Sequence, residues 1–188
     1  LSATPVKIPV NFDEVIELPS SGSDYEIREV RGNWLDYVDP NLTGFIYVPG
    51  VEMTKVVCQK VADKFSNGVD VETDDPVLSY LLKHGVAFYN SQMSPNDREK
   101  VNKLLELGEV KLVCTTTALN YGVDYKFDYG IFTSPRFLTK SDFVQFAGRV
   151  GRRGHGVVYV AFNVDSLKDP PPFQPSERDV DFAKLIGG

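Results

Sequence analysis

The chain has 188 residues, 42% of them hydrophobic and 24% charged, so it can bury a full core and is not an intrinsically disordered protein. Its formal net charge of -6 argues against binding nucleic acid through bulk positive charge, so such a contact needs a local basic cluster. No apolar run reaches the ~18 residues that a membrane-spanning helix needs, and no secretory signal is present, so an intracellular protein is expected. Cys58 and Cys114 lie in apolar runs without metal-ligand neighbours, which predicts two small buried residues and no metal site.

The N-terminal third of the chain predicts strands and then a helix. Alternating patterns favour strands over residues 12–18 and 25–30, separated by a turn-rich segment. Residues 44–50 form a continuous apolar run bounded by glycine and proline, which is typical of a strand buried on both faces of a parallel sheet. The apolar spacing over 51–65 predicts an amphipathic helix, ended by Asn67-Gly68.

Strands and helices continue to alternate over the rest of the chain. A short helix is expected to start at Asp74-Asp75-Pro76, and another to run to Leu107 with Ser94 as its N-cap and Pro95 at its first position. Further buried strands are expected over 86–89, 110–114, 129–132 and 157–162, and a linker with a short helix after Asp169. This alternation predicts an α/β fold, a three-layer sandwich around a mostly parallel sheet.

Ligands of such sheets bind at the carboxyl ends of the strands. Three polar stretches fall there: Pro49-Gly50, Asn90-Ser91-Gln92 and Thr115-Thr116-Thr117. The three threonines offer hydroxyl and backbone N–H groups where a strand meets a short helix, which favours a phosphate contact. The alternative is a strand end that is rich in threonine because threonine favours strands.

The stretch 145–154, Gln-Phe-Ala-Gly-Arg-Val-Gly-Arg-Arg-Gly, is the most distinctive in the chain. It follows a predicted helix that begins near residue 140, with Ser141 or Asp142 as its cap. Arg149 and Arg152 are three residues apart and are expected to project from one side, as a planar cationic pair suited to a triphosphate. Three glycines in the stretch would weaken a helix, which indicates close approach to a ligand or to another backbone. A flexible basic loop that touches nucleic acid loosely is the alternative.

A nucleotide site built on these arginines would be incomplete within this chain. The chain contains no G-x-x-x-x-G-K-[ST] phosphate loop and no G-x-G-x-x-G fingerprint. An arginine supplied from a neighbouring domain to a phosphoryl group is a known arrangement, worth about three to five orders of magnitude in hydrolysis rate. The pattern therefore indicates one half of a composite site.

The motifs together resemble the second, C-terminal RecA-like domain of superfamily 2 helicases. Gln145-Phe146-Ala147-Gly148-Arg149-Val150-Gly151-Arg152 is similar to motif VI, residues 112–124 to motif V, Phe45–Pro49 to motif IV, and Ser2-Ala3-Thr4 to motif III at the end of the preceding domain. The resemblance covers residues 1–163 and is closest to the Ski-type RNA helicases. Residues 89–92 depart from the Ski-type pattern, and a viral helicase, acting in a host-cell cytoplasm, stays open.

The resemblance also assigns roles to individual residues. It implies catalytic roles for Arg149 and Arg152 as arginine fingers and for Gln145 as a link between the nucleotide and nucleic-acid sites. Gly122, Asp124 and Gly148 would lie at the nucleotide, and Thr116, Thr115, Pro49, Asn90 and Ser91 along a single strand.

Arg98 is either a support for the loop at Asn90-Ser91 or a solvated surface arginine. His84 is expected to be a helix-end cation, and the acidic residues 70–75 a solvated loop and helix start.

The resemblance implies an ATP-dependent helicase motor. ATP and Mg²⁺ would bind between this domain and the preceding RecA-like domain of the same chain, which supplies the metal ligands, so this fragment alone should be inactive. The partner is single-stranded nucleic acid, RNA in preference to DNA, and no membrane is involved. The expected organisation is an end of the preceding domain over 1–8, the helicase C-terminal domain over 9–165 and a linker over 166–188. The alternative is a non-catalytic scaffold that binds nucleic acid or protein.

Overall fold

The computed structural model describes residues 25–152 and 154–169. The strand expected over 12–18, the motif III segment with the boundary at residue 8, and the final helix after Asp169 lie outside these residues.

Six strands form one sheet in which every pairing is parallel. The strands are β1 (Tyr25–Glu29), β2 (Gly44–Tyr47), β3 (Val86–Tyr89), β4 (Leu112–Thr115), β5 (Tyr129–Phe132) and β6 (Gly156–Val160), in the spatial order β1-β6-β5-β2-β4-β3. The expected α/β architecture is therefore confirmed, and the sheet is wholly parallel in the described part of the chain.

Burial explains why the strands were recognisable in the sequence. Every residue of β2, β3, β4 and β5 is buried, which requires the continuous apolar runs that the sequence shows. The exposed residues of β1 lie toward its end, as suits an edge strand. On one face, Phe45 packs against Phe127, Phe132 and Phe146 with ring centroids 5.2–5.7 Å apart. These rings fix the position of the helix that carries Phe146 and precedes the arginine-rich stretch.

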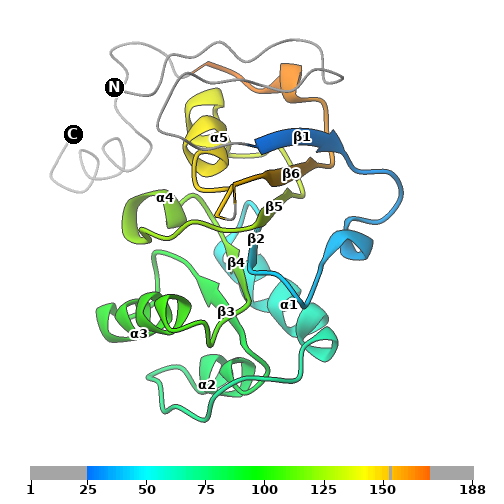
Figure 1. Ribbon diagram of the computed structural model, residues 1–188. Helices are drawn as coiled ribbons and strands as arrows, with labels where there is room; N and C mark the ends of the chain where they lie inside the picture. The colour runs from blue at the N-terminus through cyan, green and yellow to red at the C-terminus, as the bar shows by residue number, and fades with distance from the viewer. Residues whose placement is uncertain (1–24, 153, 170–188) are drawn as a thin grey trace, which may run out of the picture.

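Helices cover both faces of the sheet (Figure 1). They are α1 (Val51–Val61), α2 (Pro76–Leu82), α3 (Pro95–Glu106), α4 (Leu119–Gly122) and α5 (Lys140–Ala147), with 3-10 turns at Trp34–Tyr37, Ala62–Lys64 and Val164–Ser166. Helix α1 lies on one face, and α3, α4 and α5 follow one another along the other, while α2 packs against α1 and the β3 edge. The N-caps expected for α2 and α3 are confirmed: Asp75 accepts from the Val77 N–H, and Ser94 accepts from the Asp97 N–H.

The first long helix is shorter than the sequence indicated. Helix α1 ends at Val61, a 3-10 turn follows, and Phe65 is extended with its side chain buried in the core. The prediction that Asn67-Gly68 ends the helix was wrong. Gly68 instead allows close contact with the end of α2, because a Cβ at this position would lie 2.0 Å from the carbonyl oxygen of Leu82.

Candidate functional site

The polar stretches expected at the carboxyl ends of the strands lie along one edge of the sheet. Tyr47 of β2 is level with Thr115 of β4, and Tyr89 of β3 is level with the same Thr115. The residues that follow, Pro49, Thr116 and Asn90-Ser91, therefore leave the sheet at one height on three adjacent strands. We call this row the carboxyl edge.

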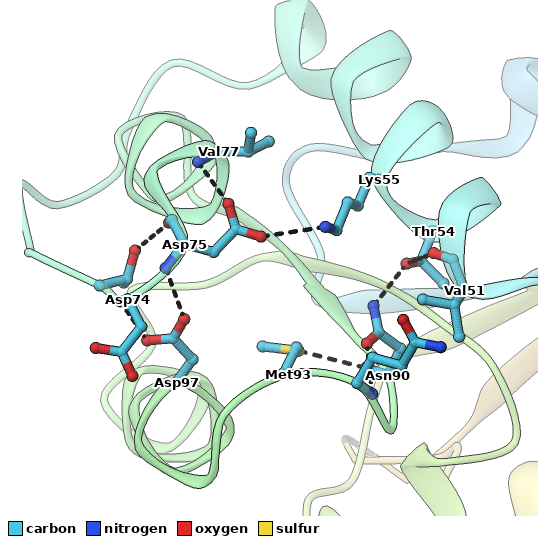
Figure 2. Close-up of polar contacts among 11 residues, drawn as sticks. Val51, Thr54, Lys55, Asp74, Asp75, Val77, Asn90, Met93 and Asp97 are labelled. Carbon is cyan, nitrogen blue, oxygen red and sulfur yellow. Dashed lines mark hydrogen bonds and ion pairs between the residues drawn. The ribbon is translucent and has the colours of Figure 1, made fainter.

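Two of these residues are turned into the protein. Asn90 is 1% exposed; its Nδ2 donates to Thr54 Oγ1 at 3.1 Å, and its Oδ1 accepts from the Gln92 N–H at 3.0 Å (Figure 2). Thr115 is 0% exposed, and its hydroxyl donates to the Thr116 carbonyl at 2.8 Å. The strand contacts expected of Asn90 and Thr115 stay a prediction, and in this conformation both side chains bond within the protein. Their hydrogen bonds shape the loops.

The other members of the row are accessible. Ser91 is exposed, whereas Pro49 and Thr116 are half-buried. Thr116 Oγ1 accepts the Ala118 N–H at 3.3 Å, which leaves its hydroxyl proton available to another acceptor. Arg98 donates to the carbonyl of Ser91 at 3.2 Å and to that of Met93 at 3.0 Å. The interpretation of Arg98 as a support for this loop is therefore confirmed.

A buried aspartate that sequence reasoning missed ties this loop to the acidic segment. Asp97 is 1% exposed, and its two carboxylate oxygens accept the backbone N–H groups of Asp74 at 2.8 Å and Asp75 at 3.0 Å. Figure 2 shows these bonds bridging the starts of α2 and α3. The only local signal was an acidic residue three positions after the N-cap Ser94. The two backbone N–H groups that donate to Asp97 lie more than 20 residues earlier in the chain, and nothing in the sequence indicated this pairing.

A cleft of about 330 Å³ lies beside this bridge, between α1, the start of α2 and the start of α3. Lys55 reaches across it to Asp75, with Nζ and Oδ2 3.2 Å apart. Asp70, Glu72 and Asp74 are exposed and Asp75 is the N-cap of α2, so the expectation of a solvated loop and helix start is confirmed. No group of three or more His, Cys, Asp or Glu side chains suited to a metal ion occurs among residues 25–152 and 154–169. His84 lies where α2 ends, with Nδ1 3.0 Å from the Phe65 carbonyl oxygen.

The arginine-rich stretch is mostly not helical. Helix α5 is capped by Thr139, whose side chain accepts the Asp142 N–H while Asp142 accepts the Thr139 N–H. The predicted caps, Ser141 and Asp142, were wrong, because the capping box starts earlier. The helix ends at Ala147 with Gly148 as its C-cap, and Gln145 is exposed on its last turn. The two arginines lie beyond its end, so the helical spacing that was to place them on one side does not apply.

Arg149 is held by the chain itself. Its guanidinium donates to the carbonyl oxygens of Val123 and, at 2.9 Å, of Asn120, at the end of α4. Burial lowers the pKa of Arg149, and the carboxylate of Asp124 partly opposes that shift. Within the described residues, Arg149 Nε and the nearby Tyr125 hydroxyl are buried without a hydrogen-bond partner. The region therefore has hydrogen-bonding capacity that this conformation does not use.

Arg152 is placed differently. It is exposed, and its guanidinium lies over the Tyr125 ring, 4.7 Å from the centroid. A tight turn puts it there: Gly151 has a φ of 116°, and both Gly151 and Arg152 donate backbone N–H groups to the Phe127 carbonyl. A Cβ on Gly156 would lie 2.7 Å from the Gly151 nitrogen, so this turn requires close approach of two backbones. That accounts for glycine here without a ligand.

Two of the residues expected at the nucleotide, Gly122 and Asp124, flank the Val123 carbonyl that Arg149 contacts, and Gly122 also lies against Tyr89 at the carboxyl end of β3. Gly122 and Asp124 are exposed and follow the carbonyls that Arg149 contacts. Val150 forms a bridge with Phe127, just before β5 begins, which is the opposite end of the sheet from Thr116. Gly122 also cannot carry a side chain without rearrangement, since a Cβ would lie 2.0 Å from the Tyr89 hydroxyl. The turn after α5 and Thr116 thus lie at opposite ends of the sheet, and α4 contacts both Arg149 and the carboxyl edge.

No helix in the described ranges is long and apolar enough to cross a membrane. The human exosome RNA helicase MTR4 is 26% identical to this chain over 159 residues, covering 77% of this chain and 14% of MTR4. The Drosophila melanogaster protein named Helicase POLQ-like is 30% identical over 98 residues, covering 50% of this chain and 9% of that protein. The crystal structure of DUF1998 helicase MrfA bound to DNA aligns with 77% of this chain and 17% of its own, at 16% identity and a TM-score of 0.48.

The chain therefore spans only a small part of the length of the curated relatives that it matches. A family model, the helicase conserved C-terminal domain, matches residues 51–154, more than half of the 188. The matched region begins at α1 and ends in the turn after Arg152, so it contains the stretches similar to motifs V and VI. This chain belongs to the helicase C-terminal domain family of superfamily 2.

Proposed function

We propose that this chain is the C-terminal motor domain of an ATP-dependent helicase or translocase that moves along single-stranded RNA. In this function ATP and Mg²⁺ bind between it and a preceding RecA-like domain, which holds the phosphate loop and the metal ligands. The chain contributes Arg149 and Arg152 at the nucleotide and the carboxyl edge at the strand. The alignment with MTR4, an RNA helicase by name, favours RNA because it covers more of this chain than the alignment with Helicase POLQ-like.

The observation that carries the proposal is the attachment of Arg149 to the end of α4. Its guanidinium holds the carbonyls of Asn120 and Val123, and the chain from Thr116 at the carboxyl edge to Asn120 is only one short turn. Asn120 is itself buried and donates through Nδ2 to the Asp142 carbonyl of α5 at 3.3 Å. A displacement of Arg149 therefore acts on the segment between α4 and Thr116. Coupling between the nucleotide site and the strand site requires such a physical connection.

The side chains of Arg149 and Arg152 suit the phosphate end of a nucleotide. Arg152 is an exposed cation that makes no ion pair within the part of the chain that the structure describes. Guanidinium groups match phosphate oxygens in geometry as well as in charge. Bound ATP supplies the phosphoryl group whose transfer to water drives the cycle. Arg152 is free to meet the γ-phosphate directly, while Arg149 acts from its place against α4 or exchanges a carbonyl acceptor for a phosphate oxygen.

The decisive experiment compares ATP hydrolysis by the full-length protein that contains this chain, with and without oligouridine or oligothymidine. Arg152→Ala should lower kcat on the order of 10³-fold or more while nucleotide binding is largely kept, because the arginine acts mainly in the transition state. Arg149→Ala should lower kcat and also weaken the stimulation by RNA, because it breaks the link to α4. Arg31→Ala, an exposed arginine in the loop after β1, is the matched control and should leave both unchanged.

Other outcomes point elsewhere. Unchanged turnover in Arg152→Ala, or no turnover in the wild type, would favour the non-catalytic scaffold. Equal or stronger stimulation by oligothymidine would overturn the RNA preference. The 188-residue chain alone should hydrolyse ATP negligibly, and turnover by it with Mg²⁺ would refute the division of roles between two domains.

A further inference from the structure

The loop between β5 and α5 carries a bulky residue in a backbone conformation that such residues avoid. Phe137 has a φ of 60°, and no other residue but glycine has a positive φ within the described ranges. Its side chain is nevertheless 57% exposed, one of the largest exposures of an apolar side chain in the described fold. Backbone strain of this kind persists only where the surrounding structure imposes it, and it is concentrated at functional sites.

The loop is built so as to hold this conformation. The hydroxyl of Tyr47, from the core, donates to the Arg136 carbonyl at 2.5 Å. The Arg136 N–H donates to Ser134 Oγ at 3.1 Å, and the Leu138 N–H to the Pro135 carbonyl at 3.1 Å. Leu138 is buried, which anchors the residue after Phe137. A firmly held loop thus presents an aromatic ring that the core does not use.

Phe137 is accompanied by a cation. The Arg136 guanidinium lies over its ring, 4.9 Å from the centroid, and is itself exposed. An exposed aromatic face beside an arginine is the combination with which proteins hold single strands, since the ring stacks on a base and the cation neutralises a phosphate. Such a pair recognises any nucleobase, because every base has a π-face.

The position of the loop agrees with that chemistry. Phe132, the last residue of β5, is level with Tyr47 of β2, and Thr133 donates both its N–H and its hydroxyl to the Tyr47 carbonyl. Strand β5 is the neighbour of β2 on the side away from β4. The loop therefore extends the carboxyl edge by one strand, beyond Pro49, in line with Thr116 and Ser91.

We propose that Phe137 and Arg136 form a base-stacking site at the β5 end of the carboxyl edge, where a nucleobase of the bound single strand lies on the Phe137 ring. This inference rests on the proposed single-strand binding of the carboxyl edge and adds a base contact to its backbone contacts. Because Arg136 already lies on one face of the ring, the base takes the other face or displaces the guanidinium toward the adjacent phosphate.

The first test places a fluorescent ring at the site. In a Trp34→Phe background, which removes the chain's one tryptophan, Phe137→Trp should be quenched when an oligouridine of roughly 12 nucleotides is added. Tyr80→Trp in the same background is the matched control, because Tyr80 is 52% exposed but lies near the C-terminal end of α2, beside His84. Its fluorescence should not change. Quenching at both positions, or at neither while the strand binds, would overturn the proposal.

The second test separates binding from folding. Phe137→Gly suits a positive φ and removes only an exposed ring, so the variant should be at least as stable as the wild type. It should nevertheless bind the oligouridine roughly tenfold more weakly by fluorescence anisotropy, and Arg136→Gln should bind more weakly with a shallower salt dependence. Wild-type affinity in Phe137→Gly would refute the base-stacking site alone, whereas wild-type protein that binds no strand would refute the proposed function as well.

Discussion

Removing the carboxylate of Asp97 should cost this domain a large share of its stability. Asp97→Ala leaves the N–H groups of Asp74 and Asp75 without the acceptors that they have at 2.8 and 3.0 Å. An unpartnered buried N–H costs about 1–3 kcal/mol. Water in the adjacent cleft can replace part of the lost acceptors, so the free energy of unfolding should fall by about 2–4 kcal/mol. For a domain of this size that corresponds to a drop in Tm of roughly 5–15 °C.

The measurement is urea unfolding of the 188-residue chain, followed by circular dichroism. Glu99→Ala is the control, because Glu99 is an exposed carboxylate on the same helix and its removal should change stability by less than about 0.5 kcal/mol. Asp97→Asn should fall between the two, since an amide offers one acceptor oxygen and turns its NH₂ toward the other N–H. In Asp97→Ala, amide exchange at residues 74 and 75 should accelerate. Equal midpoints for Asp97→Ala and Glu99→Ala would refute the reasoning.

Two further predictions concern the buried thiol of Cys58 and the carboxylate of Glu26, which pairs with Arg28. Burial and the neighbouring Cys114 raise the pKa of the Cys58 thiol well above its ordinary value of 9.0. Both cysteines are also buried, so neither should react with a thiol reagent until the chain unfolds; rapid labelling in native buffer would contradict this. Hydrogen bonds from Arg28, and then from His155, lower the pKa of Glu26 below its ordinary 4.5. The stability that this carboxylate contributes is present above about pH 4.5 and lost as the pH falls through the lowered pKa. Arg28→Ala should raise that pKa in a carboxyl NMR titration, and no change would show that the pair does not form in solution.

The sheet could be predicted from the sequence because four of its strands, β2, β3, β4 and β5, are buried along their whole length. Each needed an uninterrupted apolar run, and glycine, proline or a capping residue marked where the run stopped. The caps of α2 and α3 are equally local, since Asp75 and Ser94 bond to groups two or three residues away. The cap of α5 was missed by a few residues because Thr139, Ser141 and Asp142 are all good capping residues, and only the geometry selects among them.

The site could be predicted only in part, because its geometry depends on distant contacts. The acceptors of Arg149 are backbone carbonyls 26 and 29 residues away, and a carbonyl has no signature in a sequence. The same is true of the N–H groups that Asp97 holds, 22 and 23 residues away. The burial of Asn90 and the positive φ of Phe137 are also tertiary facts: each residue type is ordinary at its position until the surrounding loops are known.

The separation of the two ends of the sheet has a consequence for how the proposed motor would work. The turn with Gly151 and Arg152 bonds to Phe127 before β5, while the residues proposed to contact the strand follow the carboxyl ends of β2, β3 and β4. The sheet between them is buried and close-packed, so it resists bending. The four-residue helix α4 touches both, through Arg149 at one end and the Thr116 turn at the other. A nucleotide that draws Arg149 away from the carbonyls of α4 therefore changes the grip on the strand by releasing one short helix, and the sheet can stay rigid throughout the cycle.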